Sequence, residues 1–220
     1  MREKILSSWS SGKDSGLALY SLLQNNELEI IALLTTITAD YDRVSMHGVR
    51  RELLEAQSAS IGIPLEKVSI SKNCSNTEWE EKIQATLLHY KAQGVTSVAF
   101  GDIFLEDLKK YRELNLAKIG MKGLFPLWKQ KSIILAKKFI GLGFKAIVTC
   151  VDGKKLDCKY CGREYDEKFL SDLPEDVDCC GENGEFHSFV YAGPLFKTPI
   201  SFSKGSIVLR DNQFYFCDLI

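Results

Sequence analysis

Six consecutive residues near the N-terminus have the composition of a phosphate-binding turn. Their hydroxyl groups can donate hydrogen bonds, Gly12 lets the backbone approach a ligand closely, and Lys13 adds a positive charge. If a helix begins here, its free N–H groups and the positive end of its dipole also face the ligand. We therefore expect a cradle for pyrophosphate, formed by Ser10, Ser11, Gly12, Lys13, Asp14 and Ser15.

Asp14 is the residue of this turn that would repel a phosphate group. Its presence is explained if it holds Mg²⁺, a cation that prefers carboxylate and phosphate oxygens. The sequence lacks the G-x-x-x-x-G-K-[ST] pattern, so transfer of a γ-phosphate is not the first expectation. The plain alternative is a capped helix start with a solvent-exposed lysine, but the whole hexapeptide is uncommon between a strand and a helix.

A second candidate group follows a later apolar run. Gly101 and Asp102 come directly after residues 98–100, which have the pattern of a strand. Ligands bind at the carboxyl edge of a parallel sheet, so Asp102 is expected near the phosphate turn, where it could share the metal or orient a ribose. Its alternative role is a helix cap. Arg112, on the next helix, could reach the phosphates or be an ordinary surface arginine.

The segment 181–187 gathers carboxylates, an amide and an imidazole on what is expected to be a flexible turn. An amine must lose a proton before it attacks an activated acyl group, and a nearby carboxylate or imidazole can accept that proton. Both carboxylates are expected to face one pocket and attract ammonium, although a polar hairpin loop fits the pattern equally well. The candidate catalytic residues are Glu182, Asn183, Glu185 and His187.

The chain has seven cysteines, an odd number that is typical of reduced thiols rather than of a disulfide framework. Cys158 and Cys161 resemble half of a zinc site. The next pair, Cys179 and Cys180, is adjacent, and adjacent cysteines rarely both ligate one tetrahedral ion. We expect incidental thiols here, with a metal or redox site as the alternative.

Strand and helix signals alternate through the first half of the chain. Apolar runs of strand length are separated by segments whose leucines recur at helical spacing. Parallel strands need crossover connections, which are usually helical, so this alternation favours a parallel sheet with helices on both faces. Strands are expected at 4–9, 29–37, 65–70 and 98–100, and helices at 16–23, 48–61 and about 76–93, the last with a cap signal at Asn76, Thr77 and Glu80.

The pattern changes at about residue 125. One more helix and a strand are followed by irregular spacing and by short strands between Gly, Asn and Asp turns. The sequence thus predicts an α/β fold in two domains. A doubly wound, mostly parallel sheet in residues 1–124 would bind the nucleotide, and a smaller α+β domain in residues 125–220 would bind the substrate.

The composition is that of an ordinary globular protein. Of 220 residues, 45% are apolar and 26% charged, and the formal net charge of −1 provides no broad basic field to attract nucleic acid or an anionic membrane. The apolar runs are far shorter than the roughly 18 residues of a membrane span, and the N-terminus has no signal-peptide pattern. We expect a cytoplasmic protein.

The turn at residues 10–15 resembles the S-G-G-K-D-S signature of the PP-loop ATP pyrophosphatases, whose fold is HUP-like. Ser11 stands where the general pattern has glycine, a departure that a small residue tolerates if its φ is negative. The resemblance implies that the chain binds ATP with Mg²⁺ and cleaves it between the α and β phosphates.

Further segments resemble, in order and spacing, the diphthine-ammonia ligase family and its bacterial relatives, over nearly the whole chain. The resemblance implies that ATP adenylates the carboxylate of diphthine, on a modified histidine of a translation elongation factor, and that ammonia then forms the amide. For a bacterial relative it implies amidation of a small molecule, with cobalamin metabolism as one setting. The matching segments are residues 46–50, 101–103, 126–128, 162–164 and 181–187.

Two other functions are compatible with parts of the sequence. Related PP-loop enzymes thiolate tRNA with C-x-x-C cysteines, but that activity needs a basic face, which the near-neutral charge disfavours. A nucleotide-sensing module of similar fold would make the polar segment 181–187 superfluous. The leading expectation is therefore an amide-forming ligase.

Overall fold

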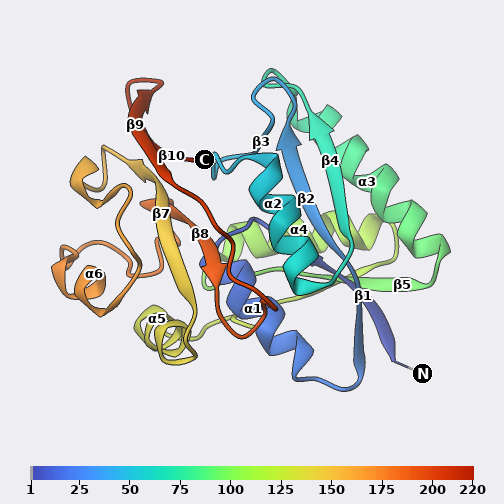
Figure 1. The fold of residues 1–220 in the computed structure, drawn as a ribbon. Coiled ribbons are helices and arrows are strands. Elements are labelled where there is room, and N and C mark those ends of the chain that lie inside the picture. The colour runs from blue at the N-terminus through green and yellow to red at the C-terminus, as the bar shows by residue number, and fades with distance from the viewer. Residues whose placement is uncertain (1) are drawn as a thin grey trace.

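The computed structural model describes residues 2–220 and contains two sheets (Figure 1). In the six-stranded sheet, the parallel strands run in the order β4, β2, β1, β5, β6, and the short β3 pairs antiparallel with β2. This mostly parallel sheet confirms the predicted doubly wound α/β class. Its strands are β1 (Glu3–Ser8), β2 (Leu28–Thr38), β3 (Arg43–Val44), β4 (Leu65–Ile70), β5 (Val95–Ala99) and β6 (Lys122–Leu124).

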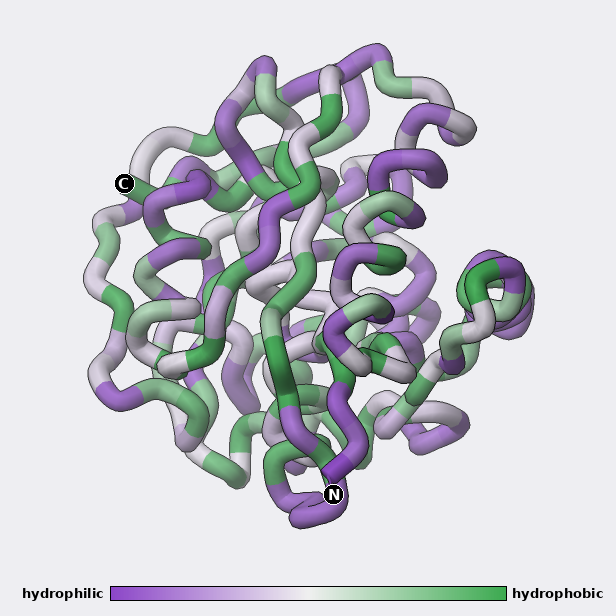
Figure 2. The backbone as a smooth tube through the Cα atoms, turned by 90° about the vertical axis from the view of Figure 1, so that its right-hand side faces the viewer, coloured by the Kyte–Doolittle hydropathy of each residue, from purple (hydrophilic) through white to green (hydrophobic). Residues whose placement is uncertain are grey.

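Helices cover both faces of this sheet (Figure 1), and Figure 2 shows hydrophilic and hydrophobic residues interspersed along the whole backbone. Leu19 of α1 and Leu54 of α2 enter a core that they share with the second sheet, whereas Leu87 of α3 and Leu116 of α4 enter a separate core. No helix within residues 2–220 is long and apolar enough to cross a membrane. The bounds are α1 (Lys13–Leu23), α2 (Arg51–Ile61), α3 (Asn76–Ala92) and α4 (Glu106–Lys118).

The adjacent strands β1 and β5 form the switch point of the sheet. After β1 the chain builds β2 and β4 on one side, and it then crosses to β5 on the other side. Ligands bind at the carboxyl ends of such strands. The loop after β5 packs directly on the first turn of α1, where a Cβ on Gly101 would lie 2.9 Å from the carbonyl carbon of Asp14. Glycine is needed for this close approach.

The second sheet is antiparallel, with strand order β8, β7, β10, β9. It confirms the smaller α+β unit at the C-terminus, although the exact boundary between residues 124 and 125 stays a prediction. Strand β8 lies against the start of α1, where the N–H of Val190 donates to the carbonyl oxygen of Ser11 at 2.9 Å. The elements are α5 (Ser132–Gly141), β7 (Lys145–Asp152), the short 3-10 helix η1 (Cys158–Tyr160), α6 (Glu167–Asp172), β8 (Phe186–Ala192), β9 (Lys204–Arg210) and β10 (Phe214–Leu219).

Three local predictions were wrong for physical reasons. The helix expected from residue 48 begins at Arg51, because Gly48 adopts a positive φ of 68° after the strand β3. The N-cap of α3 is Ser75, which forms a reciprocal capping box with Glu78, so the expected cap lay too far along the chain. His187 lies within strand β8 and not on a flexible turn.

Candidate functional site

The phosphate turn, residues 10–15, joins β1 to α1 at the carboxyl edge of the first sheet. Ser11 adopts φ 67°, a left-handed conformation that costs a non-glycine residue about 1 kcal/mol or more. We expected serine to replace glycine here without strain only if its φ were negative, so the positive φ of Ser11 makes the replacement strained. Gly12 begins α1 without a side-chain cap, and a Cβ on it would lie 2.9 Å from Cε1 of His47. The cap residue itself therefore makes no hydrogen bond to the first turn of the helix, although the N–H of Lys13 donates to Oγ of Ser188 at 3.2 Å.

Lys13 is buried in the first turn of α1, and its ammonium group faces the second sheet. Nζ lies 2.8 Å from Oδ2 of Asp14, donates to the backbone oxygen of Cys180, and stands 5.1 Å from the ring centroid of Phe186. Burial is the largest single influence on the pKa of Lys13 and lowers it, but the charge of Asp14, the hydrogen bond it accepts from Lys13, and the nearby Cys180 and Asp178 together raise it, so the net shift is upward. Lys13 is therefore charged at neutral pH.

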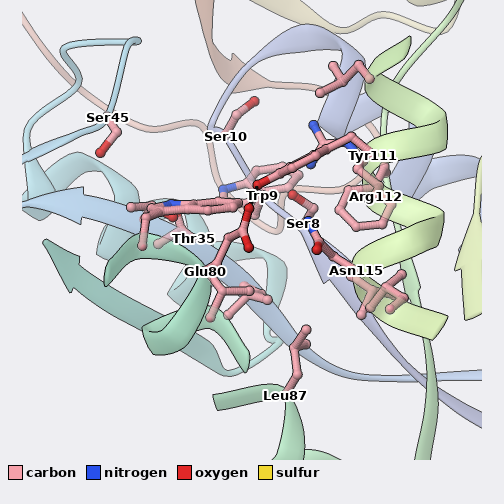
Figure 3. Close-up of a pocket in the computed structure, with 18 of the residues that line it drawn as sticks. Ser8, Trp9, Ser10, Thr35, Ser45, Glu80, Leu87, Tyr111, Arg112 and Asn115 are labelled. Carbon is pink, nitrogen blue, oxygen red and sulfur yellow. Dashed lines mark hydrogen bonds between the residues drawn. The ribbon is translucent and has the colours of Figure 1, made fainter. Parts of the chain in front are cut away.

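A cavity of about 530 Å³ opens beside the turn, between α3 and α4 (Figure 3). Its volume falls in the range of about 300–1,000 Å³ typical of small-molecule sites. Thr35 of β2 lines it with a buried Oγ1 that has no hydrogen-bond partner within residues 2–220, so a ligand can bond to this hydroxyl. Much of the remaining wall is apolar and comes from Leu34, Trp79, Ile83, Leu87, Phe100 and Leu116.

Asp102 lies at the predicted edge of the sheet, paired with Arg112 of α4. Nε of Arg112 is 2.6 Å from Oδ2 of Asp102, and the guanidinium carbon is 4.3 Å from the ring centroid of Phe100. In Figure 3, Arg112 extends from α4 into the space beside Ser8 and Ser10. The guanidinium group of Arg112 is therefore held beside the turn, and the carboxylate of Asp102 is already paired with it.

A second, polar cavity of about 230 Å³ lies between the phosphate turn and residues 181–188. Glu182 reaches from this segment to the loop after β5, where Oε1 accepts a hydrogen bond of 2.8 Å from the N–H of Ile103. Burial raises the pKa of Glu182 to about 7, even though that hydrogen bond favours the charged form. The two cavities adjoin, because both are lined by Ser8, Ser10, His47, Phe100, Arg112 and His187.

His47 and His187 meet where the two cavities join. Their ring centroids are 4.5 Å apart, and Nδ1 of His47 lies 3.3 Å from the carbonyl oxygen of Ser188. Burial lowers the pKa of both rings, with the charge of Lys13 as a further cause, and the pKa of His187 falls to about 4. Both imidazoles are therefore neutral at pH 7.

The other two predicted catalytic residues are placed differently. Glu185 is buried, and its Oε1 accepts hydrogen bonds from the N–H of Asp178 at 3.2 Å and from the amide of Asn183 at 3.0 Å. Neither Glu185 nor Asn183 lines the polar cavity. The expectation that both carboxylates face one pocket was therefore wrong, because the chain turns at Gly184, whose φ is 82°.

Neither cavity has a cysteine among its lining residues, although Cys180 directly precedes Gly181 of the polar cavity. All seven are free thiols. Cys158 is exposed, whereas Sγ of Cys161 is buried 3.2 Å from the carbonyl oxygen of Tyr215, and burial raises its pKa to about 12. Within residues 2–220, no group of three or more His, Cys, Asp or Glu side chains could hold a metal ion. Whether zinc binds stays a prediction.

Sequence reasoning gave no individual role to two residues that touch the phosphate turn. His47 appeared only within a matching segment, because its partner His187 is 140 positions away in the chain. Gln57 is completely buried on α2. A signal for it existed, since a glutamine three and four positions after Leu54 and Leu53 lies on the apolar face of the helix.

Two family models match the chain. The model of the diphthamide synthase N-terminal domain matches residues 2–123, and that of the diphthamide synthase C-terminal domain matches residues 131–217. The diphthine–ammonia ligase of Danio rerio is 27% identical over 226 residues, which cover 93% of this chain and 88% of that protein. The diphthine–ammonia ligase of Homo sapiens is 27% identical over 155 residues, 68% of this chain and 58% of that protein.

Among solved structures, the phosphate complex of phosphoadenylyl-sulfate (PAPS) reductase from Candida auris aligns with 62% of this chain and 71% of its own. The TM-score of 0.36 and the identity of 14% are too low to support a conclusion. The match to the family models does support a conclusion, because the N-terminal model alone spans more than half of the chain. This chain belongs to the diphthamide synthase family.

Proposed function

We propose that this chain is an ATP-dependent ligase that activates a carboxylate as its adenylate, releases pyrophosphate, and joins the acyl group to ammonia. The observation that carries the proposal is the position of the phosphate turn between two adjoining cavities, one largely apolar and one polar. A nucleotide placed across the junction has its base in the first cavity and its phosphates at the start of α1. The names of the similar ligases, which contain diphthine and ammonia, support the same reaction.

The turn suits a triphosphate on local grounds. The start of α1 has no side-chain cap, and Ser11 Oγ is buried with no partner among residues 2–220. Asp14 lines the polar cavity and is the residue that would hold Mg²⁺, whose charge would neutralise phosphate oxygens. Asp102 is a weaker candidate because Arg112 already occupies it.

The residues of the polar cavity suit the transfer to ammonia. If the turn grips the β and γ phosphates, the α phosphate faces the side of the cavity that contains Glu182 and His187. Glu182, with its pKa of about 7, can take a proton from ammonium near neutral pH, and the neutral His187 can accept a hydrogen bond from the amine. An attacking amine released in this cavity is already beside the activated carbonyl.

The acceptor is a carboxylate, and diphthine on an elongation factor is the acceptor that the names of the relatives favour. A small-molecule carboxylate is the alternative for a bacterial chain. Thiolation of tRNA is less favoured, because neither cavity is lined by a cysteine.

The test is a product analysis with ATP, ammonium and a candidate acceptor. The expected products are AMP and pyrophosphate in a 1:1 ratio with the new amide, measured by chromatography. Exchange of labelled pyrophosphate into ATP that depends on the acceptor, in the absence of ammonium, would identify the adenylate step. Formation of ADP and orthophosphate as the main products would contradict the proposal.

A further inference from the structure

Gln57 of α2 is a completely buried amide that contacts the phosphate turn, and the reaction proposed above does not use it. Its Oε1 accepts a hydrogen bond of 2.9 Å from Nε1 of Trp9. Its Nε2 donates to the carbonyl oxygens of Ser11 at 3.1 Å and Val190 at 2.6 Å. The orientation of the amide is forced, because an indole N–H only donates and a carbonyl oxygen only accepts.

We propose that Gln57 is a positioning residue for the phosphates of the nucleotide. It holds Ser11 in the left-handed conformation and so fixes the direction of the N–H groups at the start of α1. This inference rests on the proposed nucleotide site, but it concerns how that site is kept in shape and not which reaction follows.

The geometry of one peptide links Gln57 to the ligand. The carbonyl of Ser11 and the N–H of Gly12 belong to the same trans peptide and therefore point in opposite directions. Two donors, Nε2 of Gln57 and the N–H of Val190, hold the Ser11 carbonyl. The N–H of Gly12 is thereby directed to the opposite side of the turn, away from Gln57.

Strain at Ser11 makes such a restraint necessary. A serine at φ 67° relaxes toward negative φ unless its surroundings hold it. Trp9 before the turn and Ser11 within it are both bonded to the same amide, so Gln57 fixes the path of the chain as it leaves β1. A residue of this kind organises the anion site before the ligand arrives, which lowers the cost of binding.

The same amide ties the turn to the second sheet. Val190 of β8 accepts from Gln57 and donates to Ser11, and Oγ of Ser188 accepts from the N–H of Lys13 at 3.2 Å. Ser188 and His187 are neighbours on the strand that lines the polar cavity. The shape of the phosphate turn and the position of this strand are therefore set together.

The experiment compares Gln57→Met with a matched control on the same helix. Methionine has similar length and removes all three hydrogen bonds. Ser60→Ala is the control, because Ser60 also links α2 to the C-terminal part of the chain, through the carbonyl and N–H of Thr198, without touching the turn. Inorganic pyrophosphate and adenosine are titrated separately by calorimetry, and thermal melting follows the stability of each variant.

We expect Gln57→Met to bind pyrophosphate about tenfold or more weakly and adenosine as the parent does, since only the turn is disturbed. Ser60→Ala should lower the melting temperature and leave both affinities unchanged.

If a folded Gln57→Met binds pyrophosphate like the parent, or if the parent binds none, the inference is wrong. Gln57→Leu replaces the methionine variant if the latter does not fold. A parent that binds pyrophosphate but forms no amide would refute the proposed ligase and leave this role of Gln57 standing.

Discussion

Burial lowers the pKa of Lys13, but the neighbouring negative groups, with Asp14 at 2.8 Å foremost among them, together raise it by more. Its ammonium is therefore available to a phosphate as a full charge in a site shielded from water. Removing one charge-assisted contact costs about 1.5–3 kcal/mol, which corresponds to a loss of affinity of roughly tenfold to more than a hundredfold.

We accordingly expect Lys13→Ala to weaken ATP binding by that factor. Isothermal titration with a non-hydrolysable ATP analogue measures it. Lys129→Ala is the control, because Lys129 is an exposed lysine that pairs with Glu106 outside both cavities. Equal affinities of the Lys13 variant and the parent would remove Lys13 from the phosphate site.

Glu182 gives the site its expected pH dependence. Its carboxylate must be deprotonated to act as a base, and its pKa is raised to about 7, so amide formation should rise with pH through about 7. Glu182→Gln should abolish this rise with pH and reduce turnover by roughly a hundredfold, while ATP affinity stays within a few-fold of the parent. Rates measured from pH 5.5 to 8.5 at saturating ATP test both statements.

The same pKa has a consequence for stability. A carboxyl group whose pKa is raised in the folded state stabilises the fold at pH values below its ordinary pKa of 4.5. This contribution is lost as the pH rises through the raised pKa of about 7. The stability of Glu182→Gln relative to the parent should therefore increase as the pH is raised from 5 to 8.

Glu185→Gln is the contrast. Glu185 accepts hydrogen bonds from Asp178 and Asn183, so its replacement should lower the melting temperature, while the rate of amide formation should still rise with pH.

At the scale of elements, Asp218 of β10 joins the second sheet to the first. Its carboxylate pairs with Arg43 of β3 at 2.8 Å and with Arg50, just before α2, at 2.6 Å. The hydrogen bond from Arg50 is the largest cause that lowers its pKa, which falls to about 2. Because its pKa is lowered in the folded state, Asp218 stabilises the fold at pH values above its ordinary pKa of 3.8. This contribution is lost as the pH falls through about 2.

Asp218→Asn should therefore melt at a lower temperature than the parent at pH 7 and pH 5, and the difference should shrink below pH 3.8. Scanning calorimetry over this range provides the measurement. Exposed Glu81→Gln serves as a control for the loss of one charge. A difference that does not change with pH would show that packing, and not the ion pairs, explains the effect.

The capping box of α3 provides a second element-scale prediction. Oγ of Ser75 accepts from the N–H of Glu78, whose carboxylate accepts from the N–H of Ser75. Ser75→Ala should cost about 1 kcal/mol of unfolding free energy. Thr77→Ala, at a position that the sequence favoured for the cap, should cost less, and denaturant titration distinguishes the two.

At the scale of the whole molecule, one core joins the two sheets. Leu17 and Leu54 of the first unit belong to the same buried cluster as Phe139, Phe189 and Val190 of the second, and Figure 1 shows α1 lying between the sheets. Separating the units would expose these side chains to water, at about 1.5–3 kcal/mol for each large one.

We therefore expect a single unfolding transition for the intact chain. A fragment of residues 1–124 should have low stability and exposed apolar surface. Calorimetry of the chain and circular dichroism of the fragment provide the test. Two separate transitions, or a fragment as stable as the parent, would show that the units fold independently.

The sequence by itself predicted the main helices and strands of the first unit, the turn at residues 10–15 between a strand and a helix, and the edge of the sheet at which Asp102 lies. These features are encoded locally, because helical and strand periodicity, glycine in turns and the position of a turn after a strand depend on neighbouring residues. The same reasoning missed the short strands β3 and β6, since two or three residues give no periodic signal.

Only the tertiary structure decided which polar groups meet. Gln57 bonds to Ser11 and Val190, which are 46 and 133 positions away, and no local pattern encodes such partners. The structure also separated the surroundings of Glu182 from those of Glu185, because the φ of an intervening glycine and the burial of each carboxylate set them, and spacing alone does not. The pKa values of the site follow from that burial, which exists only once the two sheets pack together.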